Sequence, residues 1–248
     1  MKDKILLEVC CGDIDSVVAA KAGGADRIEL CCALGEGGLT PSYGMLTMAL
    51  DKDIPVNILV RPRRGDFCYS DIEVESMIGD ICMAGLSGVD GIVVGALTPE
   101  GDIDIAAMEK LLDEAGGLDV TFHRAFDMCR DPESALEALI KLGCHNVLTS
   151  GFKPNALDGI ENLRQLVIQA DGRINIIAGC GVTPRNAEEI IGRTGVGAIH
   201  ATCSKVVESS MSYRRKDVNM GNVEDEYSRK TSDVKKIREL RKIIDNIR

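Results

Sequence analysis

The sequence has no apolar run long enough to cross a membrane and no excess of positive charge. No stretch reaches the roughly 18 apolar residues that a bilayer-spanning helix needs, and residues 1–4 do not lead into the apolar core of a secretion signal. The formal net charge is −10, which repels the phosphates of nucleic acids and anionic lipids. These absences predict a soluble, cytoplasmic protein that binds neither nucleic acid nor membrane. Hydrophobic residues make up 45% of the chain, which is enough for a large core.

The cysteine spacings that mark zinc ribbons and thioredoxin-like sites are also missing. Ten cysteines are present, but none form a CxxC pair. A disulfide framework is not expected, because there is no export signal and Cys10-Cys11 and Cys31-Cys32 are adjacent pairs, which rarely bridge each other. Most single cysteines are therefore predicted to act as small buried hydrophobic residues.

Short runs rich in valine and isoleucine alternate along the chain with segments of helical apolar spacing. The expected strands are Ile5–Val9, Arg27–Leu30, Val56–Arg61, Gly91–Val94, Asp119–His123, Asn146–Thr149, Ile174–Ala178 and Ala198–His200. The expected helices are Ile14–Ala22, Tyr43–Leu50, Ile72–Met83, Ile105–Glu114, Pro132–Leu142, Leu157–Ala170 and Pro184–Gly192. Alternating strands and helices indicate a parallel α/β sheet, and eight strands predict its closure into a (β/α)8 TIM barrel. A doubly wound sheet is the main alternative, but Cys11-Gly12-Asp13-Ile14 follows the first strand in place of GxGxxG.

We expect a single domain over residues 1–248. Residues 206–231 are polar and irregular and predict a loop, whereas residues 232–248 return to helical spacing and predict a C-terminal helix. Helix starts are marked by capping residues and by proline at the first helical position. The expected N-caps are Asp13, Ser42, Asp104, Asp131 and Thr183, and the prolines are Pro132 and Pro184.

A four-residue pattern occurs twice, as Glu8-Val9-Cys10-Cys11 and as Glu29-Leu30-Cys31-Cys32. The copies end two consecutive expected strands, so they should lie side by side. Side chains alternate along a strand, so each Glu shares the inward face with the first cysteine of its copy. Cys11 and Cys32 are then expected to face the helices or loops.

The chemistry of such barrels sits at the C-terminal ends of the strands. Polar residues expected at this end, the mouth of the barrel, are Glu8, Glu29, Arg61, His123, Arg124, Ser150 and His200. Burying these groups unpaired would be costly, so they should pair with one another or with a ligand. The Gly-rich turn containing Gly179 and Gly181, together with Ser204 after the eighth strand, could hold an anion.

Several reaction types are not expected. No predicted strand ends in lysine, which leaves a Schiff-base mechanism without its nucleophile. A hydrolytic zinc barrel needs an HxH pair on the first strand and an Asp at the end of the eighth. This sequence has neither. What remains is general acid–base chemistry by Glu8, Glu29, His123 and His200, with Arg61 stabilising an oxyanion. The substrate would be a small anionic metabolite, phosphorylated or not.

The assembled motifs resemble the CutC copper-homeostasis family. The segments that carry the resemblance are Glu8–Cys10, Ala25–Cys31, Glu36–Ser42, Arg61–Phe67, Thr121–Asp127, Val147–Gly151 and the loop around Met211–Arg214. The resemblance implies a cytoplasmic TIM barrel, a homodimer or homotetramer, that binds Cu(I) through Cys10 and Cys31 and carries no organic cofactor. Cys11, Cys32 and Cys180 depart from the usual family pattern.

Three functions follow from these observations. The first is Cu(I) binding in copper homeostasis, the second is the acid–base enzyme, and the third is a barrel that binds a ligand without converting it. Copper binding requires neither the arginine nor the anion-binding loop of the mouth, whereas the enzyme would use both. The sequence does not identify the substrate of such an enzyme, and the fold alone does not choose between these functions.

Overall fold

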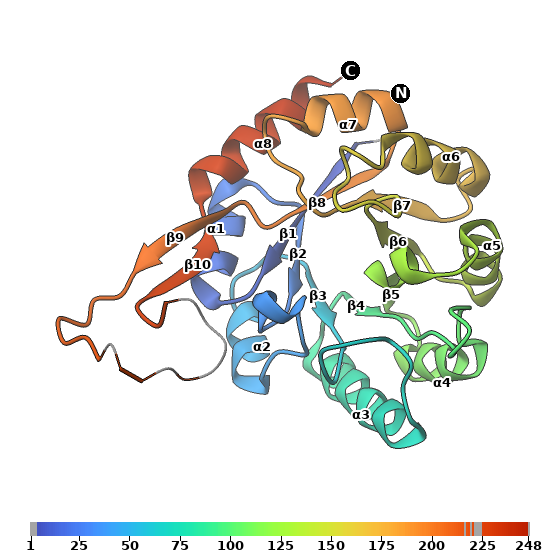
Figure 1. The fold of residues 1–248 in the computed structure, drawn as a ribbon, viewed down its shortest axis with the longest axis horizontal. Coiled ribbons are helices and arrows are strands. Elements are labelled where there is room, and N and C mark those ends of the chain that lie inside the picture. Colours follow the sequence, from blue (N-terminus) through green and yellow to red (C-terminus); the bar gives the residue numbers. More distant parts are fainter. Residues whose placement is uncertain (1–3, 216, 219, 221–224, 248) are drawn as a thin grey trace.

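The computed structural model describes residues 4–215, 217–218, 220 and 225–247. Eight parallel strands form a closed barrel in sequence order, as Figure 1 shows. They are β1 (Leu6–Cys11), β2 (Arg27–Leu30), β3 (Val56–Leu59), β4 (Gly91–Val94), β5 (Asp119–Phe122), β6 (Asn146–Thr149), β7 (Asn175–Ala178) and β8 (Ala198–Ala201). The predicted TIM barrel is confirmed. The barrel closes where β1 pairs with β8, with Glu8 opposite His200.

The helices pack outside the barrel and alternate with its strands (Figure 1). They are α1 (Ile14–Gly23), α2 (Tyr43–Leu50), α3 (Asp71–Ser87), α4 (Ile105–Ala115), α5 (Pro132–Leu142), α6 (Ile160–Ala170), α7 (Ala187–Thr194) and α8 (Val234–Asn246). Two short 3-10 helices, η1 (Leu34–Glu36) and η2 (Arg124–Met128), follow β2 and β5. Arg248, the last residue of the predicted C-terminal helix, lies outside the described residues.

The predicted helix starts are confirmed for four of the five capping residues. The side chains of Asp13, Ser42, Asp104 and Asp131 each accept a hydrogen bond from a backbone N–H in the first turn of their helix. The prediction was wrong for Thr183 and Pro184, because α7 begins only at Ala187 with Asn186 as its N-cap. Thr183 N donates to Asn186 Oδ1 at 2.8 Å, which makes this segment a turn before the helix.

The core has two parts, because strand residues point alternately outward to the helices and inward to the barrel axis. Outward residues such as Val9, Cys11 and Ile28 belong to the large apolar layer between strands and helices. Inside the barrel, Cys10 and Cys31 form a small apolar cluster together with Leu59 and Val93. A further small cluster contains Leu148, Ile177 and Ala198, with Leu6 packed against it.

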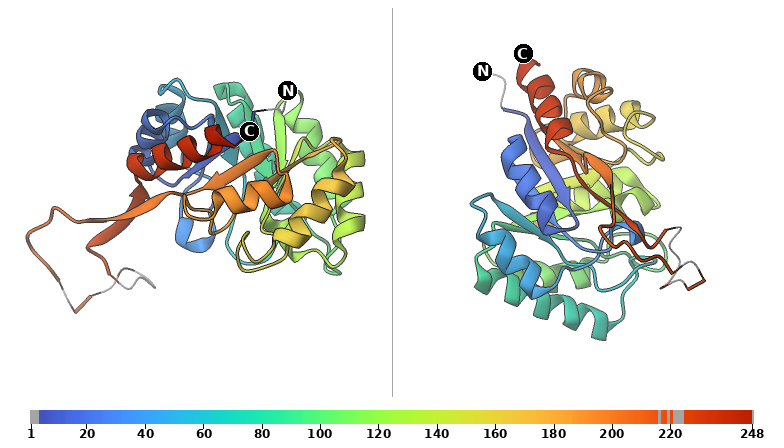
Figure 2. Two further views of the ribbon diagram at one scale, coloured as in Figure 1. Left: turned by 90° about the horizontal axis from the view of Figure 1, so that it is seen from above. Right: turned by 90° about the vertical axis from the view of Figure 1, so that its left-hand side faces the viewer.

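The sequence predicted an irregular loop over residues 206–231, but part of this segment forms strands. Residues 216, 219 and 221–224 of the predicted loop lie outside the described residues. The strands β9 (Ser204–Glu208) and β10 (Ser228–Ser232) pair antiparallel as a two-stranded ribbon that points away from the barrel (Figures 1 and 2). Its base is fixed to α1, where Ser232 N donates to Ser16 Oγ at 2.9 Å. The prediction failed because most of the ribbon is exposed on both faces and therefore shows no apolar alternation.

Within the described ranges, no helix has the length and apolarity to cross a membrane. All ten cysteines are free thiols, in agreement with the expected absence of a disulfide framework.

Candidate functional site

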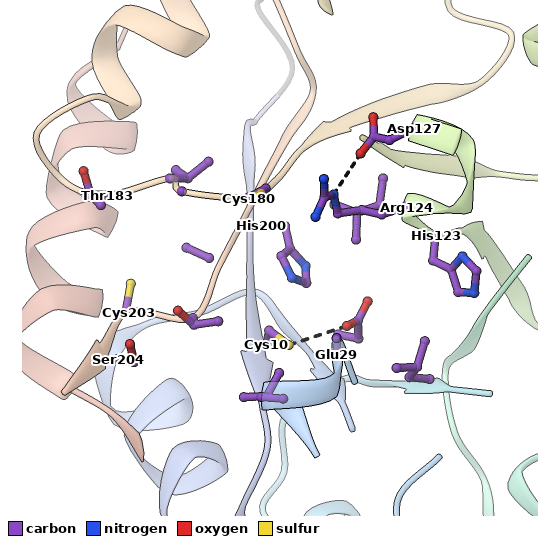
Figure 3. Close-up of a pocket in the computed structure, with 18 of the residues that line it drawn as sticks. Cys10, Glu29, His123, Arg124, Asp127, Cys180, Thr183, His200, Cys203 and Ser204 are labelled. Atoms are coloured by element: carbon purple, nitrogen blue, oxygen red, sulfur yellow. Dashed lines mark hydrogen bonds and ion pairs between the residues drawn. The ribbon is translucent and has the colours of Figure 1, made fainter. Parts of the chain in front are cut away.

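A cavity of about 900 Å³ opens at the C-terminal ends of the strands (Figure 3). Eight residues predicted for the site line it, and they are Cys10, Glu29, Arg61, His123, Arg124, Gly181, His200 and Ser204. Glu8, Cys31, Ser150 and Gly179 are not among the lining residues, and lie directly behind or beside them. The structure thus gathers most of the predicted set around one space.

Glu8 is completely buried beneath the cavity and holds two cations. Its Oε1 lies 2.8 Å from His200 Nδ1, and its Oε2 accepts a hydrogen bond of 2.6 Å from Arg27 Nε. Burial alone would raise the pKa of Glu8, but the bonds and charges of His200 and Arg27 hold it below its usual value. Burial would lower the pKa of His200, yet the charges of Glu29 and Glu8 raise it. These neighbours therefore favour the protonated form of His200 at the cavity wall.

Glu29 is a buried carboxyl group with one oxygen free for a ligand. Its Oε1 accepts a contact of 3.5 Å from the Cys10 thiol, whereas its Oε2 has no hydrogen-bond partner among the described residues. Burial raises the pKa of Glu29, although the charge of His200 opposes this shift. A carboxyl group with a raised pKa beside a cavity has the properties of a general acid or base.

The two inward thiols lie next to each other on neighbouring strands. Cys10 Sγ and Cys31 Sγ are 3.7 Å apart, and both side chains are buried. Cys10, Glu29 and Cys31 bring three potential metal-ligand atoms within 4.8 Å of one another. The hydrogen bond with Cys31, together with burial, raises the pKa of Cys10 well above its usual value. A metal must therefore displace thiol protons to bind here.

A second group of potential metal ligands, made of Glu8, Glu29 and His200, shares Glu29 with the thiols. Glu8 already bonds to His200 and Arg27, so it has less free capacity for an ion than Glu29. Glu29 is the residue common to both groups.

His123 follows β5 and lines the cavity, as does His200 (Figure 3). Its Nδ1 accepts a hydrogen bond of 3.1 Å from Ala125 N, at the start of η2. Burial and the nearby charge of Arg61 lower the pKa of His123 to about 3. The ring is therefore neutral at physiological pH.

Arg61 follows β3 and fastens two loops with its guanidinium group. Nη1 donates to the carbonyl oxygens of Glu36 and Gly38 at 2.9 and 3.0 Å, and Nη2 donates to that of Gly65 at 2.9 Å. Its guanidinium carbon also lies 5.0 Å from the centre of the Phe67 ring. Most N–H donors of Arg61 are thus bonded to backbone carbonyl groups. Its positive charge still lies beside the cavity, which Arg61 lines.

Arg124 and Ser150 are joined through Asp127. Arg124 donates through Nε to Asp127 at 2.8 Å and through Nη2 to Ser150 Oγ at 3.1 Å. Asp127 also accepts from the backbone N–H groups of Ser150 and Phe152, which tie the loop after β6 to η2. Ser150 is completely buried, so it orients Arg124 from behind.

The Gly-rich turn after β7 lines the cavity through Cys180 and Gly181, both of which have positive φ angles, 72° and 73°. The N–H of Gly179 is already used, since it donates to Thr149 O at 3.0 Å. Ser204 lines the cavity from the start of β9. A left-handed conformation at a non-glycine residue costs about 1–3 kcal/mol, so Cys180 makes this turn unusual.

Sequence reasoning missed three residues of this region. Arg27 begins β2 and pairs with Glu8 and Asp119, and only the fold brings these carboxylates together. Asp127 and Phe67 lie in segments that resemble the CutC family, but the sequence alone shows no role for either. A buried charge opposite a buried carboxylate is detectable only once the strand register is known.

The closed barrel, with its titratable side chains gathered at the strand ends, defines a TIM-barrel protein with a polar mouth. The model of the CutC family matches residues 5–205, and the chain belongs to this family.

Relatives cover nearly the whole chain. A CutC family protein of Bacteroides thetaiotaomicron is 46% identical over 238 residues, which are 94% of this chain and 96% of that protein. The human copper homeostasis protein cutC homolog is 46% identical over 245 residues, 98% of this chain and 90% of that protein. The crystal structure of a CutC protein from Streptococcus agalactiae has a TM-score of 0.77 at 36% identity, covering 80% of this chain and 98% of that one.

Proposed function

We propose that this protein binds Cu(I) in copper homeostasis, with Cys10 and Cys31 as its ligands. The observation that carries this proposal is the pair of buried thiol sulfurs 3.7 Å apart. Soft thiolates select Cu(I) over harder cations. Family membership and the name of the human relative support the same function.

The spacing of the two sulfurs favours a third ligand. At a metal–sulfur distance of about 2.3 Å, a linear arrangement would need the sulfurs roughly 4.6 Å apart, whereas they lie 3.7 Å apart. A bent arrangement leaves room for another donor, and Glu29 Oε1 lies 3.5 Å from the Cys10 sulfur. Glu29 is therefore the proposed third ligand. Entry occurs through Cys10, which lines the cavity, because Cys31 is completely buried.

The copper proposal is tested by competition with a Cu(I) chelator under reducing conditions. The double variant Cys10→Ala/Cys31→Ala should lose binding, whereas the matched control Cys11→Ala/Cys32→Ala should retain it. Because burial and Cys31 raise the pKa of Cys10, the affinity should increase with pH as protons are displaced more easily. Equal Cu(I) affinity in both double variants would show that the inward thiols are not the ligands.

A second candidate function is an acid–base enzyme acting on a small anionic metabolite at the same mouth. The unpartnered Oε2 of Glu29, a carboxyl group with a raised pKa, favours it. Arg124 and the loop residues Gly181 and Ser204 would bind the anionic part of the substrate. Glu8 would act by holding His200, because Glu8 is completely buried and does not line the cavity.

A thermal-shift screen against anionic metabolites tests the second candidate. A true substrate should stabilise the wild type, and Glu29→Gln should keep this stabilisation while losing turnover. Arg124→Ala should lose much of the stabilisation. Absence of any stabilising metabolite would count against the enzyme and leave Cu(I) binding as the function. We also propose that the protein is located in the cytoplasm and forms a homodimer or homotetramer. Light scattering at known protein concentration measures the oligomeric state.

A further inference from the structure

The imidazole of His123 is held in one tautomer by the backbone that follows it. Ala125 N donates to Nδ1 at 3.1 Å, so Nδ1 must offer its lone pair and cannot carry a proton in the neutral ring. The proton of the neutral ring is then on Nε2. His123 therefore presents an N–H donor, and not a lone pair, on its free side.

This donor has no partner although it is buried. His123 is 5% exposed, and no described residue accepts a hydrogen bond from its Nε2. The same residue lines the cavity at the mouth. A buried donor left unpaired costs about 1–3 kcal/mol, so a chain keeps one where a ligand supplies the acceptor.

The surroundings prevent the ring from turning away. A Cβ atom at Gly95 would lie 2.6 Å from Cε1 of His123, so only glycine leaves room for the imidazole. The Phe67 ring lies on another side, with its centre 5.0 Å from that of His123. Arg61, whose guanidinium covers Phe67, places positive charge near the ring and opposes its protonation.

We propose that His123 Nε2–H binds the carbonyl or carboxylate oxygen of a small metabolite in the cavity. This inference rests on the second candidate function and assigns His123 as a hydrogen-bond donor in place of the acid–base role suggested by the sequence. A neutral donor is suited to an oxygen on which negative charge develops, because it needs no reorganisation when that charge appears. With a hydrogen on Nε2 and the lone pair of Nδ1 used by Ala125 N, His123 is not a metal ligand, and the proposed Cu(I) ligands remain Cys10, Cys31 and Glu29.

The tautomer is tested in the free protein by two-dimensional ¹H–¹⁵N NMR of the imidazole nitrogens. The chain has three histidines, and His123→Gln identifies the signals of His123 by their loss. The expected spectrum shows a neutral ring protonated on Nε2 at every pH between 5 and 8. A ring that titrates in this range, or one protonated on Nδ1, would overturn the inference.

Ligand binding is tested by titrating pyruvate, 2-oxoglutarate and dihydroxyacetone phosphate, with inorganic phosphate as a probe that lacks a carbonyl group. At least one carbonyl probe should shift the Nε2–H signal in a saturable way, and phosphate alone should not. His123→Leu should weaken this binding about tenfold, equivalent to about 1.4 kcal/mol, whereas His123→Gln, which restores an N–H donor, should stay within about threefold. The inference is wrong if no carbonyl probe shifts the signal, or if His123→Leu binds as tightly as the wild type.

The two proposals fail in different ways. A neutral Nε2–H ring that binds a carbonyl probe without any turnover would remove the enzyme and keep the binding site. Turnover that survives in His123→Leu, with unchanged substrate affinity, would keep the enzyme and remove the role of His123.

Discussion

Two histidines face the same cavity in opposite electrostatic surroundings. His200 lies 2.8 Å from a carboxylate oxygen of Glu8, and the negative charges beside it raise its pKa. His123 lies near Arg61, and burial together with that positive charge lowers its pKa to about 3. Protonation is thus favoured for the His200 ring and opposed for the His123 ring. The position of a histidine at a strand end does not determine its chemical role. The charged groups packed around the ring determine it.

The largest expected effect comes from removing the charge behind His200. Glu8→Gln leaves the buried cations Arg27 and His200 without their common carboxylate, and breaking a buried pair in this way costs about 3–5 kcal/mol. Urea denaturation at pH 7 should show this loss, and the pKa of His200 should fall. The control Glu137→Gln, at an exposed ion pair with Arg173, should change stability far less. Comparable losses in the two variants would contradict the buried cluster.

Crowding the ring of His123 should have the next largest effect. Gly95→Ala places a methyl group 2.6 Å from Cε1 of His123, and such overpacking costs about 1–3 kcal/mol. Thermal or urea denaturation measures the loss, and the imidazole NMR signals should move. Gly79→Ala is the control, because this exposed site in α3 has open space around it, and alanine there should stabilise the helix. An unchanged stability in Gly95→Ala would mean that the ring is free to move aside.

The two histidines should also give opposite dependences of stability on pH. The unfolded chain protonates His123 near its ordinary pKa of 6.5, whereas the folded protein does so only near 3, so this residue lowers stability as pH falls from 6.5 toward 3. The stability that the raised pKa of His200 contributes is fully present below pH 6.5. It is lost as pH rises through that raised pKa.

His123→Gln should therefore remove about 1.4 kcal/mol per pH unit from the slope of unfolding free energy between pH 6 and 5. Urea denaturation at several pH values measures this slope for the wild type and for the variant. Parallel slopes for the variant and the wild type would show that His123 is protonated in the folded protein.

The smallest expected effect concerns the aromatic cover of His123. Phe67→Leu removes an aromatic contact that is generally worth about 0.5–1.5 kcal/mol. It also admits water to the ring and should raise the pKa of His123 above 3, because burial is the main cause of its low value. Phe152→Leu, which removes the contact with Phe126, is a matched control that should leave the pKa of His123 unchanged. Imidazole NMR in mild acid distinguishes the two.

The barrel was predictable because its elements repeat. The bounds of β2, β4, β6, α2 and α5 agree with the predicted ranges to the residue. Other ends moved by one to four residues: β3 stops at Leu59 before Arg61, whereas α3 runs on from Met83 to Ser87. Apolar periodicity identifies the middle of an element, whereas its end depends on local hydrogen bonds.

The contents of the mouth were predictable, but the pairings within it were not. Strand alternation placed Cys10 and Glu29 at the cavity, where both are found. It could not show that Arg27, at the start of β2, would neutralise Glu8. Nor could it show that the backbone of Ala125 would fix the tautomer of His123. Such partners follow from register and loop conformation, which a single sequence does not display.

The contact between Glu8 and His200 closes the barrel between residues that are 192 positions apart in the chain. Contacts of such long range form late in folding, because a large loop must be ordered before they bring any gain. During synthesis on a ribosome, Glu8 emerges 192 residues before its partner His200. A probe placed at this pair would therefore report the closure of the barrel, the moment at which its first and last strands meet.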